Sequence, residues 1–411
     1  MRTPLFSSIF VVSLFLVLLY ETLMLSTSLT GQSFQKILLT SLLWVAIPLT
    51  LLNLVKKFKI FRTDFPKPCR RLLYILFIWH IFNIIRGLID LEVPISTAFG
   101  NIYNILGLLT PLAIGYALNL NNINKLFQFL MLISVVYLPI FALSLMIGGE
   151  EGPYKVLENA VVCLWPVLFI WPVGIYSIGR NIKILLLALI IFSAALLTGD
   201  RTLLLRIILL AVTVSFLVLL RIGIFNWIRK YLFVLALIPF YLFGLSVSSG
   251  ESVFNQNQRT SGDDLLHDTR TFLYVEVLND LKDSKSLWIG KGAMGTYFSD
   301  FFHSTGGDID TRNHVEVGVL SIMLKTGIIG LFLHAGILLF AAYLGMYKSK
   351  NLFSFGIGLI LLQYFDLQFI KYPMAFTLDN FLLWFFIGLP FSKELRQMSD
   401  LDILKKKLLF R

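Results

Sequence analysis

Long apolar runs separated by short polar segments dominate this chain. A helix needs about 20 apolar residues to cross a bilayer, and lipid tolerates only structures whose backbone hydrogen bonds are made internally. The pattern therefore predicts an all-α, polytopic membrane helix bundle with about twelve transmembrane helices. The predicted spans are 5–26, 37–55, 71–89, 98–118, 125–147, 157–178, 182–199, 202–221, 230–248, 315–345, 352–371 and 374–391.

One long polar stretch interrupts the alternation between the ninth and tenth predicted spans. It divides the chain into nine spans within 1–248, a loop over 249–314, three spans within 315–391, and a basic tail over 392–411. A connection of this length is either functional or disordered. We therefore expect the loop to carry part of the function.

The second half of this loop has a local pattern. Apolar residues recur at near-helical spacing at Phe272, Val275, Leu278 and Leu281. Asp268 can cap the helix that they define. We expect a short amphipathic helix near the membrane surface, ending before Ser284. The glycines that follow it predict a tight turn; they are Gly290, Gly292 and Gly295.

The composition is that of a membrane protein, and the distribution of Lys and Arg among the loops predicts its orientation in the membrane. The chain is 57% hydrophobic, has a mean hydropathy of +0.80 and is only 14% charged, against about a quarter in soluble proteins. The net charge of +11 does not indicate nucleic-acid binding, because Lys and Arg gather in alternate short loops. The loop 56–71 is rich in them and 90–97 has none. The positive-inside rule then predicts cytoplasmic termini and an external loop over 249–314.

Two arginines far apart in the sequence fall at this external face. Arg201 lies in the turn before the eighth span, and Arg270 opens the predicted loop helix. A guanidinium binds phosphate through paired N–H donors, so two of them could hold a pyrophosphate. Arg206 lies about 8 Å deeper, needs a partner or a wet cavity, and is a further candidate. The alternatives are an arginine that snorkels to water for Arg201 and a solvated helix face for Arg270.

A candidate base precedes the tenth span at the same face. His314 can take a proton from a hydroxyl at neutral pH, or it can simply cap the helix. Glu316 is a second possible base. Arg312 either pairs with Glu316 at the i,i+4 spacing of a helix or joins the anion-binding set. No histidine or cysteine spacing resembles a metal site, so neither a metal nor a cofactor is predicted.

Other ionisable residues within the predicted spans also lie towards the external side. Such residues are functional candidates by default. They are Arg86, Asp90, Glu158, Asp366 and Asp379. By contrast, His80 lies in the middle of the third span, and we expect a neighbouring group to satisfy it.

Several motifs give the region 180–345 a family likeness. They are Asp200-Arg201-Thr202, Arg270 at the loop helix, Gly290-Lys291-Gly292, Asn313-His314, and Gly327-Ile328-Ile329-Gly330. Together with the topology, they resemble the O-antigen ligase and O-antigen polymerase superfamily of bacterial membrane glycosyltransferases. That family often has His-Asn nearer the glycine pair, and Glu316 occupies the position where its histidine is expected. The base is therefore either His314 or Glu316.

The resemblance implies an activity in the bacterial inner membrane. A glycan carried on undecaprenyl pyrophosphate would be transferred to an acceptor hydroxyl, without a nucleotide sugar and without a metal. The acceptor would be a lipid A core sugar for a ligase, or another lipid-linked glycan for a polymerase. Arg201 and Arg270 would hold the pyrophosphate, and His314 would deprotonate the acceptor. Membrane lipid is the other expected partner, and nucleic acid is not expected.

Two other functions compete with this one. A transporter or flippase for a polysaccharide precursor should have ionisable residues near the bilayer midplane and internal repeats. The sequence has external clustering and no evident repeat, which favours the enzyme. A structural subunit of a membrane complex would lack a site altogether.

Overall fold

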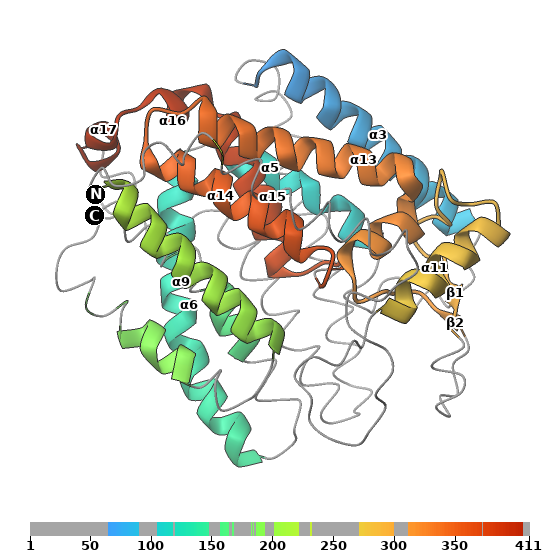
Figure 1. Ribbon diagram of the computed structural model, residues 1–411, viewed down its shortest axis with the longest axis horizontal. Helices are drawn as coiled ribbons and strands as arrows, with labels where there is room; N and C mark the ends of the chain where they lie inside the picture. Colours follow the sequence, from blue (N-terminus) through green and yellow to red (C-terminus); the bar gives the residue numbers. More distant parts are fainter. Residues whose placement is uncertain are drawn as a thin grey trace.

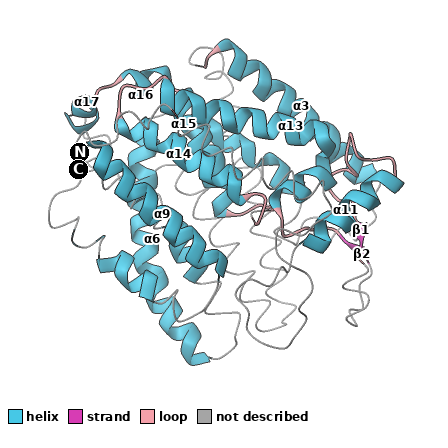
Figure 2. Ribbon diagram, in the orientation of Figure 1, coloured by secondary structure: helices cyan, strands magenta, loops and turns pink. Residues whose placement is uncertain are grey.

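The computed structural model describes the chain in segments, and most of the described residues are helical. The described residues are 65–89, 105–117, 120–147, 157–163, 167, 182, 184, 186–193, 201–221, 231, 271–299, 311–371 and 373–405. The longer helices are α3 (Lys67–Ile89), α6 (Leu120–Ile147), α9 (Arg201–Arg221), α11 (Thr271–Asp283), α13 (Gly318–Tyr347), α14 (Leu352–Leu367) and α15 (Leu378–Phe391). The shorter elements are the 3₁₀-helix η3 (Ile105–Ala113), α5 (Ile114–Ala117), α16 (Lys393–Gln397), α17 (Asp400–Lys405) and the strands β1 (Tyr297–Phe298) and β2 (Thr311–Arg312). Figures 1 and 2 show their arrangement.

Three of the described helices are long and apolar enough to cross a membrane. They are Lys67–Ile89, Asn122–Ala142 and Gly318–Tyr347. Shorter apolar helices cover Gly107–Ala117, Leu205–Leu220, Leu352–Leu367 and Leu378–Phe391. A multi-pass helical membrane protein follows from these helices, but the predicted number of about twelve spans is not confirmed. The predicted spans 5–26 and 37–55 lie outside the described residues.

The fourth predicted span, 98–118, is not a regular α-helix where the structure describes it. It forms η3 and then α5, so the tighter 3₁₀ geometry replaces the expected helix. Pro111 lies inside η3 and has no amide hydrogen to donate. A Cβ atom on Gly107 would approach the backbone of Ala375 to 3.2 Å. The glycine therefore lets η3 pack closely against the segment before α15.

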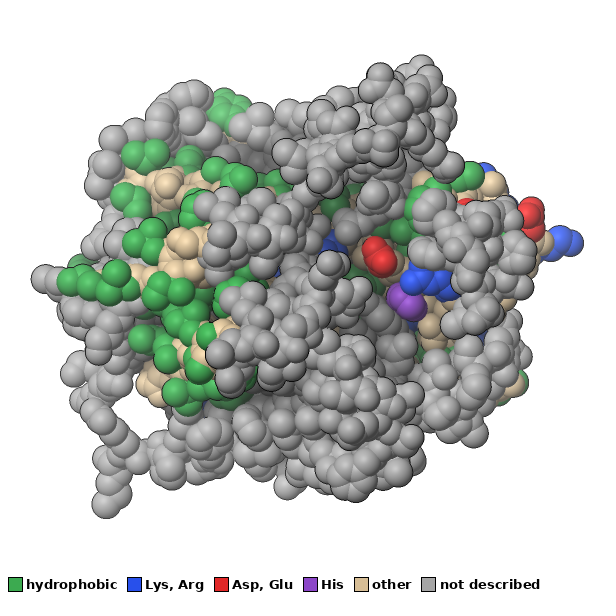
Figure 3. All heavy atoms as spheres, turned by 90° about the horizontal axis from the view of Figure 1, so that it is seen from below, with side chains coloured by type: hydrophobic (Ala, Val, Ile, Leu, Met, Phe, Trp, Pro, Cys, Tyr) green, Lys and Arg blue, Asp and Glu red, His purple; other side chains and the backbone are tan. Residues whose placement is uncertain are grey.

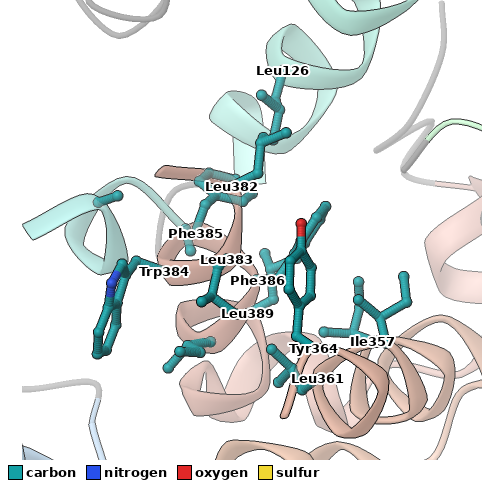
Figure 4. Close-up of a cluster of buried hydrophobic side chains, with 14 of the residues drawn as sticks. Leu126, Ile357, Leu361, Tyr364, Leu382, Leu383, Trp384, Phe385, Phe386 and Leu389 are labelled. Carbon is teal, nitrogen blue, oxygen red and sulfur yellow. The ribbon is translucent and has the colours of Figure 1, made fainter. Parts of the chain in front are cut away.

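Helix α15 lies at the centre of the described bundle. It is apolar around its whole circumference and buries every residue from Phe381 to Phe391, as expected of a helix enclosed by others. Figure 4 shows Leu382 of α15 beside Leu126 of α6 and Phe386 beside Tyr364 of α14, while Trp384 points to the other side of α15. The outer face of α3, by contrast, is exposed and apolar, which suits contact with lipid.

The long helix α13 is broken at Gly327. This residue has φ of 68° and ψ of −174°, so the predicted span 315–345 consists of two helical pieces. Hydrogen bonds from α3 and from the loop after α11 bind the break to its neighbours. Lys291 N–H donates to the Leu324 carbonyl (2.7 Å), Trp79 Nε1 donates to Thr326 O (2.9 Å), and Ile328 N–H donates to Leu287 O (3.0 Å). The two predicted glycine motifs thus lie against each other.

We expect Gly327→Ala to lower the free energy of unfolding by about 2–4 kcal/mol. The positive φ is strained for any residue with a Cβ atom, and that atom would overlap the carbonyl oxygen of Trp288. Gly336→Ala in the same helix is the matched control, because a Cβ there meets nothing within 4 Å. We expect the control to be neutral or stabilising by up to about 1 kcal/mol. Denaturant titration of both variants in detergent micelles tests this; equal losses would contradict it.

The predicted loop helix is confirmed as α11, although the face that it buries differs from the predicted one. The buried residues are Leu273, Tyr274, Val277 and Leu281, which pack on the first half of α13. Val275, predicted to be on the apolar face, is 55% exposed. The predicted cap Asp268 lies outside the described residues.

A short antiparallel ribbon follows α11, and the all-α prediction did not include it. Strands β1 and β2 pair Tyr297 with Arg312 and Phe298 with Thr311. Two-residue strands carry too little alternation to be recognised in a sequence. The ribbon fixes Arg312 relative to the loop that follows α11.

The basic segments predicted to be cytoplasmic meet at one end of the bundle. Lys350 N–H donates to the Arg396 carbonyl (2.8 Å), and the rings of Phe65 and Phe391 are 5.5 Å apart. These contacts bring together the start of α3, the α13–α14 turn and the end of α15. The opposite end carries His314 and the acidic residues Glu158, Asp366 and Asp379, which lie at or beside the α14–α15 turn. This separation agrees with the predicted sidedness, while the orientation in the membrane stays a prediction.

Candidate functional site

The turn between α14 and α15 is the meeting point of three segments at the end opposite the basic loops. Arg206 of α9 forms an ion pair with Asp379 (2.8 Å), Tyr274 of α11 donates its hydroxyl to Phe369 O (2.5 Å), and Gly318 N–H at the start of α13 donates to Lys371 O (3.1 Å). The beginnings of α9, α11 and α13 therefore lie around one turn (Figure 1).

These three contacts are made close to the residues predicted to form the site. Arg206, Tyr274 and Gly318 follow Arg201, Arg270 and His314 by five, four and four residues. From Arg201 to Arg206 the helix advances by about 8 Å, whereas the four non-helical residues from His314 to Gly318 can span up to about 13–14 Å. Helix α9 begins at Arg201, but that side chain lies outside the described residues, as does all of Arg270. Anion binding by these two arginines stays a prediction.

The buried guanidinium of Arg206 is paired with an acidic residue, as the sequence led us to expect. It is 2% exposed, and its Nη2 donates to Asp379 Oδ1 and, at 3.3 Å, to the Tyr364 hydroxyl. The Tyr364 hydroxyl in turn donates to Asp379. A buried charge is tolerated when such hydrogen bonds compensate it. The pair joins α9 to α15 near the start of both helices, and the predicted contact of Arg206 with a pyrophosphate stays a prediction.

Two other ionisable residues that the sequence marked also have partners within the protein. Glu158 forms an ion pair with Lys371 at 2.5 Å. Arg86 donates to the carbonyls of Ile289 (3.1 Å) and Gly290 (2.6 Å), which joins the end of α3 to the glycine turn. These contacts give both residues a structural role.

Asp366 differs from this group. It lies near the C-terminal end of α14 and is half-buried. Its Oδ1 atom is buried without a hydrogen-bond partner in the part of the chain that the structure describes. Asp90, the remaining candidate, lies outside that part. A carboxylate oxygen left without a protein donor is available to a substrate hydroxyl.

His314 lies in the segment that leads from β2 into α13. Its neighbours Asn313 and Val315 are buried, His314 itself is half-buried, and Glu316 is exposed. Helix α13 begins only at Gly318. The predicted i,i+4 relation between Arg312 and Glu316 is therefore wrong, because both residues precede the helix. Figure 3 shows a face on which a histidine lies beside basic side chains, with an acidic side chain close by.

The imidazole of His314 is bound by the preceding arginine. Arg312 Nη2 donates to His314 Nε2 at 3.1 Å, which implies that the ring proton is on Nδ1. Burial, with the nearby charges of Arg312 and Lys325, lowers the pKa of His314 to about 4. The ring is therefore neutral at pH 7.

Further polar residues lie near Arg312, and they could hardly be predicted from the sequence. Tyr297 lies opposite Arg312 in the ribbon and is 1% exposed; burial raises the pKa of its hydroxyl to about 12. Ser299 donates to Glu276 of α11 at 2.6 Å. Only the aromatic pair after the glycine turn could have indicated a strand here.

Two residues deeper in the bundle complete the local picture. The prediction for His80 is confirmed, because its Nδ1 lies 2.8 Å from the carbonyl of Leu108. The described residues contain no group of three or more His, Cys, Asp or Glu that could hold a metal ion.

Comparison with known proteins finds a family likeness over part of the chain. Residues 186–335 match the family model described as O-antigen ligase. No curated protein and no solved structure matches the chain. The matched region contains α9, α11, the ribbon and the first half of α13, and α9, α11 and α13 meet at the α14–α15 turn. Over this region, which is less than half of the chain, the protein is similar to the O-antigen ligase family.

Proposed function

We propose that this protein transfers a glycan from undecaprenyl pyrophosphate to a sugar hydroxyl of an acceptor at the external face of the bacterial inner membrane. The family supports a glycan-transferring membrane enzyme in general. The observation that carries the more specific proposal is the convergence of α9, α11 and α13 on the α14–α15 turn. This arrangement supports a single site built from the starts of the three segments.

Arg201 and Arg270 form the anion-binding half of the proposed site. The pyrophosphate gains negative charge as the glycosidic bond to the carrier breaks, and fixed guanidinium groups stabilise that charge in the transition state. Arg206 supports this half by anchoring α9 to Asp379 one to two turns from Arg201. Arg312 contributes a further guanidinium beside His314.

His314 is the proposed base. Its neutral imidazole can accept the proton of the acceptor hydroxyl as the new bond forms. Glu316 is the alternative, but it is exposed in the irregular segment before α13, where water competes with a substrate for its carboxylate. Asp366 is proposed to accept a hydrogen bond from a sugar hydroxyl, since its buried oxygen has no described protein donor.

The break in α13 is the feature that a transporter would share, because transporters use discontinuous helices near the midplane. In a transporter, the freed backbone groups line the substrate cavity. Here Leu324 O and Thr326 O accept hydrogen bonds from Lys291 and Trp79. These backbone carbonyls are thus hydrogen-bonded to other protein groups. This favours an enzyme over a transporter.

Replacing His314 by alanine is expected to lower the rate of glycan transfer by about 10²- to 10⁴-fold, the usual contribution of a general base. Glu316→Gln should stay within a few-fold of the wild type. The measurement is glycan transfer in proteoliposomes, with the amount of inserted protein determined for each variant. The reverse pattern would assign the base to Glu316, and full activity in both variants would contradict the proposed mechanism.

A further inference from the structure

The hydrogen bond between Arg312 and His314 conflicts with the role of a ready base. A neutral imidazole has one nitrogen with a free lone pair, and the other nitrogen carries the proton. In His314 the lone pair is on Nε2, which accepts from Arg312 at 3.1 Å. In this state the ring cannot accept a proton from a hydroxyl.

The charged groups around His314 also disfavour protonation of its ring. Arg312 comes from β2, and Lys325 comes from α13, where it is 1% exposed and donates to Met374 O at 3.3 Å. The acids on the neighbouring elements are Glu316 before α13 and Glu276 on α11, which Ser299 binds. Burial, together with these two cations, keeps a proton off the ring.

We propose that the Arg312–His314 hydrogen bond is a latch, which the pyrophosphate of the lipid-linked donor opens by drawing the Arg312 guanidinium away from Nε2. This inference rests on the proposed function for the identity of the donor. A guanidinium binds a pyrophosphate by charge-assisted, bidentate hydrogen bonds, which are stronger than one bond to a neutral imidazole. Arg312 is thus a positioning residue for the base as well as a ligand of the anion.

Opening the latch links the two halves of the reaction. The freed Nε2 takes the acceptor's hydroxyl proton while the oxygen forms a bond to the donor's anomeric carbon. The bond from that carbon to the pyrophosphate breaks, and its electron pair stays on the phosphate oxygen. The anion also offsets the positive charge near the ring, which raises the pKa of His314 from about 4 towards its ordinary value. The base becomes competent only when a donor is bound.

Carbethoxylation by diethyl pyrocarbonate tests the latch, because the reagent attacks the lone pair of a neutral imidazole nitrogen. The rate at His314 is measured by peptide mass spectrometry on the full-length protein in micelles, without a substrate. We expect Arg312→Gln to raise this rate by about tenfold. Removing the cation should also raise the pKa of His314. The reaction should therefore begin to slow at a higher pH than in the wild type. Lys282→Gln is the matched control, since Lys282 is exposed at the end of α11, and should leave the rate unchanged.

Three outcomes decide the inference. Equal rates in wild type and Arg312→Gln would overturn the latch. Inorganic pyrophosphate should raise the wild-type rate in a saturable way and leave that of Arg312→Gln unchanged; no rise would overturn the anion as the trigger. The rates on the substrate-free protein do not depend on glycan transfer. A failed transfer assay would therefore overturn the proposed function separately, while a tenfold rise in Arg312→Gln would still support the latch.

Discussion

Replacing Arg206 by alanine is expected to destabilise the protein by about 3–5 kcal/mol. The change removes the partner of Asp379 and leaves its carboxylate buried, with the Tyr364 hydroxyl as its remaining described donor. Breaking a buried ion pair on one side costs more than the pair itself contributes, because one charge stays uncompensated. The free energy of unfolding from denaturant titration in micelles measures the effect.

Two further variants separate this explanation from a general loss of packing. Arg206→Met with Asp379→Leu should recover most of the lost stability, because no charge then stays buried. Lys371→Ala breaks the Glu158 pair, whose side chains are 21% and 24% exposed, and should cost about 1 kcal/mol. If Arg206→Ala and Lys371→Ala cost the same, the account of the buried pair is wrong.

Arg201→Ala and Arg270→Ala are each expected to slow glycan transfer by about 10²- to 10³-fold, as when one donor to a developing anion is removed. Each guanidinium would hold the pyrophosphate in the transition state, where its charge is greatest. The amount of folded protein should not change, because neither substitution touches the Arg206–Asp379 pair. The measurement is the transfer rate per molecule of inserted protein.

Variants of the same residue type provide the controls for this prediction. Arg201→Lys keeps the charge without the paired donors, so it should recover only part of the activity. Arg221→Ala, at the other end of α9, should transfer at the wild-type rate. An equal loss in Arg221→Ala and Arg201→Ala would mean that removing any arginine from α9 is harmful and that Arg201 has no special role.

Much of the described architecture could be predicted from apolar periodicity and charge. Helices α3, α6, α9 and α14 lie where long apolar runs predicted them, and the basic loops gather at one end. The break at Gly327 could not be predicted as such, because a glycine inside an apolar run is compatible with an intact helix. A tertiary contact accompanies the break: the loop at Trp288 occupies the space that a side chain at position 327 would need.

For the candidate site, the sequence indicated individual residues but not the contacts between them. The sequence marked Arg206, Asp379 and Asp366 as costly charges within apolar runs. It could not show that the first two compensate each other while Asp366 keeps an oxygen without a described donor. The Arg312–His314 bond was also missed, because a helix was expected where the chain is extended. Pairing between residues distant in sequence is decided by packing, which no local pattern contains.

The central claim is cleavage of a lipid-linked pyrophosphate donor coupled to glycan transfer. The direct measurement incubates the purified protein with an undecaprenyl-pyrophosphate-linked oligosaccharide and either a lipid A core acceptor or a second lipid-linked glycan. We expect one undecaprenyl pyrophosphate to be released for each glycosidic bond formed, and only when one of the two acceptors is present. The productive acceptor would distinguish a ligase from a polymerase. Movement of the intact donor across the bilayer, without cleavage and without a coupled product, would contradict the account.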